Sequence, residues 1–159
     1  MQIEKYYTET TVGNLVYTFE SIGKTVIKKV VQYSKIPPTY IGLPSNANVY
    51  NLAFGDWDDE INDFKDTITS NNGDMEKVLA TVANTANLFW SEYPNTFIYF
   101  EGSHPKGKEL IRTYLYQKKL NRYFDDISKV ALVFGLSENG WEMFTANKNY
   151  NAFLILQKD

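Results

Sequence analysis

The feature that most restricts the fold of this chain is the order in which two hydrophobic periodicities follow each other. Stretches with a period of two residues, typical of half-buried strands, are interrupted twice by stretches with a helical period. Tight turns join most neighbouring strands, and only one strand–helix–strand unit is available to form a parallel pair. This order predicts an α+β fold, a mainly antiparallel sheet with two helices packed on one face.

The first hairpin shows how these strands are recognised. A strand is expected over 15–19, where apolar residues alternate with polar ones, and a second over 25–33. The turn between them contains Gly23, which tolerates a positive φ. Within the second run Lys28 and Lys29 place a charge on both faces of the strand. That pattern predicts an edge position or a bulge.

Two helices are expected in the middle of the chain. The first begins after Asp74, a favourable N-cap, and continues at helical spacing until Pro94 and Asn95 end it. The second is expected over 105–121, with helical character continuing to Ser128. The remaining strands are expected over 49–54, 96–100, 130–134, 141–144 and 150–156.

Composition predicts one globular domain and excludes several kinds of covalent, catalytic and metal site. At 159 residues, 43% apolar and 22% charged, the chain predicts a single domain over 1–159 with an ordered core at about 14–157. The absence of cysteine excludes disulfides, thiolate metal sites and cysteine nucleophiles. A single histidine, His104, leaves no histidine-rich metal site, and no EF-hand spacing occurs. Neither a metal nor a cofactor is expected.

Charge and hydropathy favour a cytoplasmic protein. No basic region followed by an apolar stretch opens the chain, so no signal peptide is expected. No run approaches the roughly 18 apolar residues that span a bilayer, so no membrane association is expected. A net charge of −3 gives no global attraction to nucleic acid, which stays open only as a local partner.

The segment 102–109, Gly-Ser-His-Pro-Lys-Gly-Lys-Glu, nearly matches a phosphate-binding P-loop. It follows an expected strand, opens an expected helix and satisfies G-x-x-x-x-G-K. However, Glu109 replaces the hydroxyl that would hold Mg²⁺, and Pro105 removes one backbone donor. Nucleotide hydrolysis is therefore not expected at this loop.

A cationic helix start remains as a candidate anion site. Residues 105–122 carry six cations and one acid in a chain of negative net charge. A helix N-terminus with nearby lysines attracts anions even without a P-loop. The alternatives are a docking site for a phosphate-bearing or otherwise acidic partner, and an ordinary solvated helix face. The residues concerned are Gly102, Ser103, His104, Lys106, Lys108, Arg112 and Tyr116.

The run 56–66 has the opposite character, with six acids and one lysine. Its spacing has no defined coordination pattern, which argues against a metal loop. We interpret it as the complement of the cationic helix, within one chain or between subunits of a homo-oligomer. Within this run we single out Asp56. The alternative interpretation of the run is a decoy that imitates the negative charge of nucleic acid.

Several motifs match those of a known family. They are Tyr50–Asp56, Asn71–Asp74 with Lys77–Ala83, Gly102-Ser103, Arg112-Thr113 with Leu115-Tyr116, and Tyr150–Leu154. Together they resemble a family of small uncharacterised bacterial proteins, a domain of unknown function, over roughly 15–157. The resemblance implies a bacterial cytosolic domain and an incidental Gly107-Lys108 pair, but no activity. The residues that it points to are Gly102, Ser103, Arg112, Thr113 and Tyr116, with Asn72, Gly73 and Asp74 at the same edge.

Two functional hypotheses follow. Because no catalytic set is complete, the first is a non-catalytic binding module that recognises an acidic ligand or partner protein through residues 102–116. The alternative is an enzyme acting on RNA or nucleotides, such as the toxin component of a stress or defence pair. His104, Arg112 and Tyr116 would then supply acid–base and phosphate-stabilising groups. A structural or oligomeric protein that uses its aromatic surface is a third interpretation.

Overall fold

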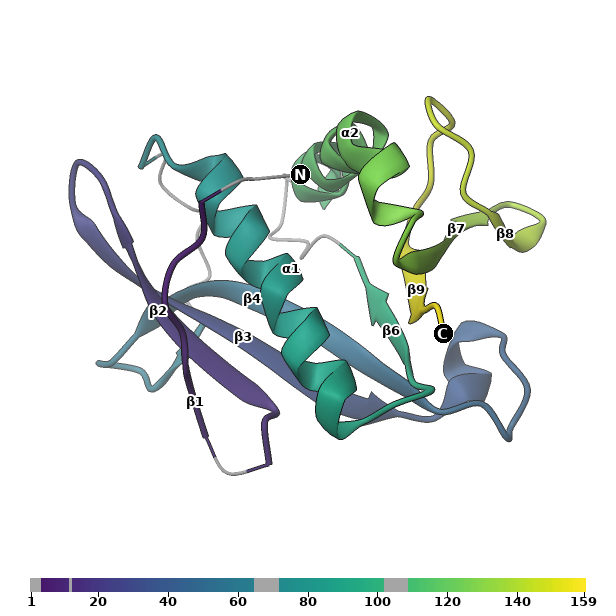
Figure 1. Ribbon diagram of the computed structural model, residues 1–159, viewed down its shortest axis with the longest axis horizontal. Helices are drawn as coiled ribbons and strands as arrows, with labels where there is room; N and C mark the ends of the chain where they lie inside the picture. Colours follow the sequence, from purple (N-terminus) through teal and green to yellow (C-terminus); the bar gives the residue numbers. More distant parts are fainter. Residues whose placement is uncertain (1–3, 12, 65–71, 102–108) are drawn as a thin grey trace. The chain divides into compact units, whose positions relative to one another are not determined.

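The computed structural model describes residues 4–11, 13–64, 72–101 and 109–159, with the backbone alone for 109–117. This part of the chain forms two α-helices, one short 3-10 helix and nine strands (Figure 1). The elements are β1 (Glu9–Thr10), β2 (Val16–Ile22), β3 (Val26–Ile36), η1 (Pro38–Ile41), β4 (Val49–Asp58), β5 (Asp63–Phe64), α1 (Met75–Glu92), β6 (Phe97–Phe100), α2 (Glu109–Ile127), β7 (Ala131–Ser137), β8 (Gly140–Met143) and β9 (Phe153–Gln157).

The strands follow the order β1-β2-β3-β4-β6-β9-β7-β8, and β5 pairs with β4. The strand pairs with a defined register are antiparallel except β4 and β6. That parallel pair is separated in the chain by α1, because parallel neighbours need a long crossover. The predicted α+β class with a mainly antiparallel sheet is confirmed, as are both helices and the hairpin at Glu138–Asn139.

The chain divides into two compact units, residues 1–34 with 52–93 and residues 35–51 with 94–159. We call them the first and the second unit. The single domain expected from the length of the chain stays a prediction. No helix in the described ranges is long and apolar enough to cross a membrane.

In the first unit, α1 packs on β3 through an aromatic and hydroxyl contact. The ring of Tyr33 stacks on Phe89 with 4.4 Å between centroids, and its hydroxyl lies 2.8 Å from Thr85 Oγ1. Burial raises the pKa of Tyr33 well above its usual range. This helix face is the apolar stripe that the sequence periodicity predicted; its buried members are Val78, Thr81, Val82, Thr85, Ala86, Phe89 and Trp90.

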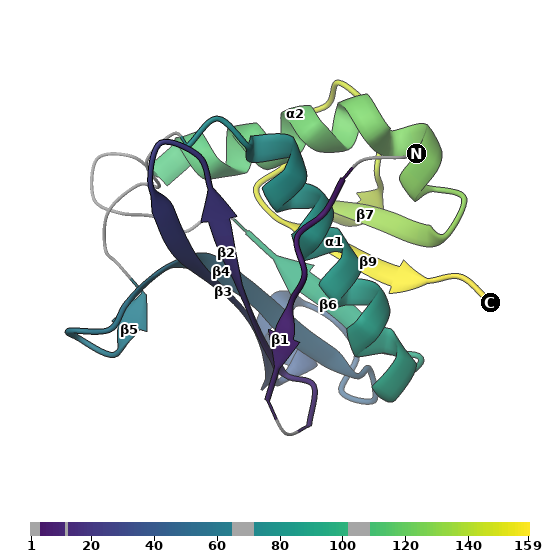
Figure 2. The same cartoon turned by 60° about the vertical axis from the view of Figure 1, so that its left-hand side comes forward.

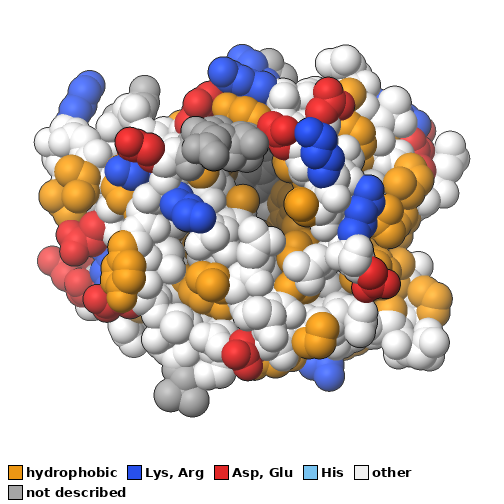
Figure 3. Space-filling model, in the orientation of Figure 1, with side chains coloured by type: hydrophobic (Ala, Val, Ile, Leu, Met, Phe, Trp, Pro, Cys, Tyr) orange, Lys and Arg blue, Asp and Glu red, His pale blue; other side chains and the backbone are white. Residues whose placement is uncertain are grey.

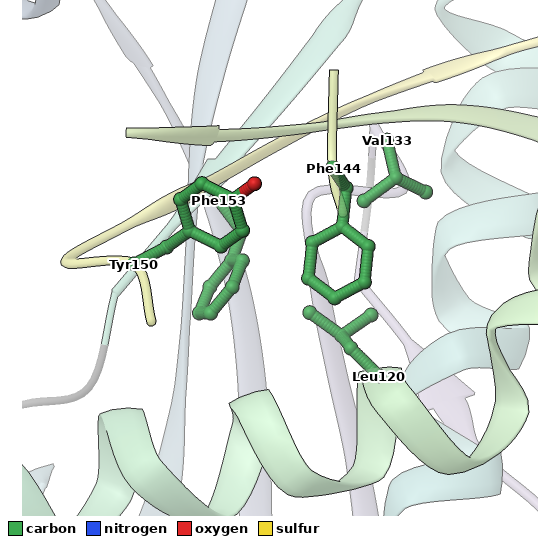
Figure 4. Packing of buried hydrophobic residues seen from close by; sticks show 5 residues of the cluster. All are labelled: Leu120, Val133, Phe144, Tyr150 and Phe153. Atoms are coloured by element: carbon green, nitrogen blue, oxygen red, sulfur yellow. The ribbon is translucent and has the colours of Figure 1, made fainter. Parts of the chain in front are cut away.

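The second unit is organised around a buried cluster of Leu120, Val133, Phe144, Tyr150 and Phe153 (Figure 4). Leu120 reaches this cluster from α2, and the aromatic rings come from the chain at and after β8. The rings of Phe144 and Tyr150 lie 5.4 Å apart. This packing decides which side of α2 faces inward.

Strand β3 corrects one expectation from the sequence. The adjacent Lys28 and Lys29 predicted an edge strand or a bulge, but β3 lies between β2 and β4 in the sheet. The edge prediction is wrong because two acids of the run 56–66 pair with these lysines. Strand β4 also continues beyond Phe54, where the sequence predicted its end, to Asp58, and its last two residues pair with β5.

Candidate functional site

Most of the predicted anion site lies outside the part of the chain that the structure describes. That holds for Gly102, Ser103, His104, Lys106 and Lys108. Arg112, Thr113 and Tyr116 lie in α2, where the structure describes the backbone of this stretch. The helix expected at this place is therefore present from Glu109 onward.

The C-terminal half of α2 separates apolar from cationic side chains. Leu120 is buried, and Phe124 packs against the same cluster. Lys118 and Arg122, one helical turn apart, are both exposed. Lys and Arg side chains reach the surface over α2 (Figure 3). Helix α2 thus anchors to its unit by one face and presents cations on another.

Two charged side chains are buried together in the first unit. Lys29 of β3 donates a hydrogen bond to Asp56 of β4, and the two side chains are only 2% and 7% exposed. Removing two charges from water is costly, and mutual neutralisation offsets that cost. Asp56, singled out in the sequence as a partner of the cationic helix 105–122, therefore pairs with the strand beside it.

The exposed neighbour of this pair is much weaker. Lys28 Nζ lies 3.4 Å from Asp59 Oδ1, with side chains 46% and 81% exposed. Asp59 also accepts a hydrogen bond from Trp57 Nε1 at 3.1 Å. Solvent screening leaves such a pair little effect on stability. Two acids of the run 56–66 thus take their partners from β3.

Asp74 joins the start of α1 to the first strands. Its Oδ2 accepts hydrogen bonds from Tyr6 OH and from Ser21 Oγ, both at 2.5 Å. Asp74 holds the N-cap position, but its side chain makes no capping hydrogen bond. Asp74 is thus the N-cap that the sequence predicted, but its carboxylate bonds the hydroxyls of Tyr6 and Ser21 in place of the helix N–H groups.

Asn72 docks the segment before α1 onto the β2–β3 turn. Its side-chain amide bonds both the carbonyl and the N–H of Thr25, at 2.9 and 3.1 Å, and it also donates to Ser21 Oγ at 3.1 Å. A Cβ at Gly23 would lie 2.1 Å from the backbone oxygen of Asn72. Glycine is required there by close approach, and Gly23 does not use the positive φ that the turn suggested.

Asn72 and Asp74 thus share a hydrogen-bond network with Ser21, which Tyr6 joins through Asp74. The edge that the family resemblance implied for Asn72, Gly73 and Asp74 with residues 102–116 stays a prediction. The network is not a nucleophile site. Ser21 is fully buried and donates directly to a carboxylate, so its oxygen is closed to a substrate. Within the described residues, no group of three or more His, Asp or Glu side chains could hold a metal ion.

The network should contribute measurably to stability. In Asp74→Ala the buried Ser21 hydroxyl and the Tyr6 phenol lose their acceptor, so the free energy of unfolding should fall by about 1–3 kcal/mol. Urea unfolding followed by circular dichroism measures this change. Glu60→Ala, at an exposed acid of the β4–β5 turn, is the control and should cost less than about 0.5 kcal/mol. Equal losses in the two variants would contradict the assignment.

A second polar cluster closes the loop after β8 in the second unit. Lys148 Nζ lies 2.7 Å from Glu142 Oε2, which also accepts a hydrogen bond from Tyr150 OH at 3.0 Å. Hydrogen bonds from Lys148 and Tyr150 lower the pKa of Glu142, and the bond to Glu142 raises the pKa of Lys148. Lys148 and Glu142 are partly exposed, Tyr150 is buried, and the three are bonded to one another, which indicates a role in holding the loop.

Sequence reasoning missed Tyr6, Ser21 and Lys29. A lysine on the inward side of a β-rich run, followed later by an acid-rich segment, was the available signal for the Lys29–Asp56 pair. Tyr6 gave no local signal, because its partners lie 13 to 75 residues away.

Comparisons with known proteins give a family and no activity. Neither the curated proteins nor the solved structures provided a match to the chain. A family model described as a family of unknown function, DUF6934, matches residues 2–158. The chain therefore belongs to the DUF6934 family of unknown function, in agreement with the resemblance that its motifs indicated.

Proposed function

We propose that the protein is a non-catalytic binding module that recognises an acidic ligand or an acidic protein partner through residues 102–116 and the adjoining face of α2. The orientation of α2 is the observation that carries this proposal. Leu120 anchors the helix in the core, whereas Lys118 and Arg122 are exposed. A helix held in this way presents cations without having to reorganise on binding.

The bonding of the acidic groups in the first unit supports a binding role over catalysis. Asp56 is neutralised by Lys29, and Asp74 accepts hydrogen bonds from Tyr6 and Ser21. Both carboxylates therefore form polar bonds with side chains of their own unit. A carboxylate already bonded to side chains of its own unit fits a structural role better than that of a general base.

The ligand chemistry follows from the side chains. Arginine recognises carboxylate and phosphate groups through paired donors, and lysine adds a point charge. Contacts of this kind between exposed charges weaken as ionic strength rises. Binding through residues 102–116 and α2 should therefore be salt-dependent and selective for anions.

The test begins with native mass spectrometry of the full chain purified gently from its host, which reports a retained anion or partner by mass. Anisotropy titrations with a fluorescein-labelled polyglutamate peptide and with single-stranded RNA then measure affinity and its salt dependence. The variant carries charge reversals at Lys106, Lys108 and Arg112. We expect it to lose at least about tenfold in affinity for the anion that the wild-type chain binds.

The matched control reverses the same number of charges elsewhere, at the exposed Lys24, Lys35 and Lys129. It should bind as the wild-type chain does, because it changes the net charge by the same amount but leaves the cations of residues 102–116 in place. Equal losses in both variants, or no binding of either probe by the wild-type chain, would contradict the proposal. Growth inhibition on expression that disappears in Arg112→Ala would instead favour the RNA- or nucleotide-acting enzyme.

A further inference from the structure

The N-terminal segment, residues 4–10, runs beside α1 and ends as β1 on the edge of β2 (Figures 1 and 2). Its ladder is short, since only two residue pairs join β1 to β2. Most of its side chains are exposed, and Tyr7 is 85% exposed. Lys5 bonds Asn84 and Thr10 bonds the carbonyl of Val16, but Tyr6 makes the most extensive contacts of the segment.

The aromatic ring, the hydroxyl and the backbone N–H of Tyr6 all make contacts with the rest of the first unit. Its ring stacks on Phe19 at 5.7 Å between centroids, and Lys77 Nζ lies 4.2 Å from the ring centre. Its hydroxyl donates to Asp74 and accepts from the N–H of Ile22 at 3.1 Å. Its own backbone N–H donates to Thr81 Oγ1 at 2.8 Å.

The groups that contact Tyr6 are held in place by the rest of the unit. Asp74 is also bonded by Ser21, and the Thr81 hydroxyl donates to the carbonyl of Lys77 at 2.7 Å. Phe19 is buried in β2, at only 4% exposure. We call this set, formed by Phe19, Ile22, Asp74, Lys77 and Thr81, the tyrosine seat. Because its members belong to β2 and the start of α1, the seat is preorganised for an extended chain carrying a phenol.

We infer that the tyrosine seat is a recognition site for a tyrosine in an extended segment of a partner protein, and that residues 4–10 occupy it in the isolated chain as a competing internal ligand. The seated segment itself shows how an extended backbone fits. Short strands with few ladder bonds open at a lower free energy than the whole domain, so an external segment can exchange with it. The inference uses none of residues 102–116 and does not depend on the proposed function.

The seat selects an unmodified tyrosine. Burial and the hydrogen bond to Asp74 raise the pKa of Tyr6, so the phenol keeps its proton and donates it to the carboxylate. A phosphotyrosine would bring a charge of about −2 against Asp74. A phenylalanine would fill the ring position and leave Asp74 with one donor fewer.

The experiment uses the full-length Tyr6→Ala variant, which empties the seat, and a synthetic peptide of residues 4–10 as the probe. NMR chemical-shift mapping of the ¹⁵N-labelled variant should show saturable shifts at the amides around Phe19, Asp74 and Thr81. The wild-type chain should need at least about tenfold more peptide, because its own segment competes. If Tyr6→Ala does not fold, the full-length Tyr6→Phe variant is used. Its ring still competes for the seat but lacks the hydroxyl, so it should need less peptide than the wild-type chain, and an equal requirement would contradict the inference.

The two adjacent tyrosines supply a matched control. A peptide with Tyr7→Ala should bind as the parent peptide does, because Tyr7 lies outside the seat. A peptide with Tyr6→Phe should bind about tenfold more weakly, and one phosphorylated on Tyr6 should not bind. Absent or unsaturable shifts, or equal losses for the Tyr7→Ala and Tyr6→Phe peptides, would overturn the inference. A concentration-dependent wild-type dimer that disappears in Tyr6→Ala would overturn it too, by assigning the seat to a second copy of the chain.

Discussion

Replacing Lys29 with methionine is expected to lower the free energy of unfolding by about 3–5 kcal/mol. The substitution keeps most of the side-chain volume but leaves the buried Asp56 carboxylate without its partner. Asp56→Val should cause a loss of similar size, because it leaves the lysine charge in the same buried place. Urea unfolding of each variant, followed by two optical probes, measures the loss and tests for a single transition.

The double variant Lys29→Met/Asp56→Val decides whether the loss comes from the unpaired charge. A hydrophobic pair of similar volume carries no desolvation cost, so the double variant should lie close to the wild-type stability or above it. Lys28→Met, at the exposed pair with Asp59, is the matched control and should cost less than about 1 kcal/mol. If the two single losses simply added in the double variant, the pair would not be acting as a unit.

Replacing Gly135 with alanine should destabilise the second unit through a direct clash. A Cβ at this position would lie 2.3 Å from Cδ1 of Tyr150, whose ring is buried. The backbone of Gly135 cannot withdraw, because β7 is paired with β9 on one side and β8 on the other. Overpacking of this kind costs about 1–3 kcal/mol, which urea unfolding will show as a lower midpoint.

Tyr150→Leu provides the partner for a double-mutant cycle. It removes the ring that Gly135→Ala would clash with. Gly135→Ala should therefore lower the free energy of unfolding much less in the Tyr150→Leu background, which gives a coupling energy of about 1 kcal/mol or more. Gly140→Ala is the control, since Gly140 has a φ of +104° and its new Cβ would approach no atom of the described residues beyond its chain neighbours within 4 Å. Its cost comes from backbone strain and should be the same in both backgrounds. Additive effects of Gly135→Ala and Tyr150→Leu would refute the clash.

Local patterns carried the prediction of the secondary structure and the fold class. The helical stripe that begins after Asp74 became α1, and the alternating runs became strands with boundaries a few residues away from those expected. The two-residue turn at Glu138–Asn139 joined β7 and β8 as its sequence indicated. These elements were predictable because periodicity and turn chemistry act over neighbouring residues.

The position of the polar groups was less predictable. The charges at Lys28 and Lys29 indicated an edge strand, because a charge on an inward face is unfavourable unless something neutralises it. The neutralising residue, Asp56, lies 27 residues further along the chain. Asp74 was expected to cap its own helix with its side chain. Its carboxylate instead accepts hydrogen bonds from Tyr6 and Ser21, which are distant in the sequence.

The sequence by itself determined the order of the two helices and of the strands longer than two residues, the α+β class, the absence of cysteine chemistry and the cationic character of residues 105–122. All of these depend on residue identity and on spacing along the chain. Only the tertiary structure decided that β3 is an interior strand, that Lys29 pairs with Asp56, and that Tyr6 occupies a seat built from β2 and α1. Hydrogen bonds and ion pairs act over a few ångströms, so they depend on which segments folding brings together, and no local pattern records that.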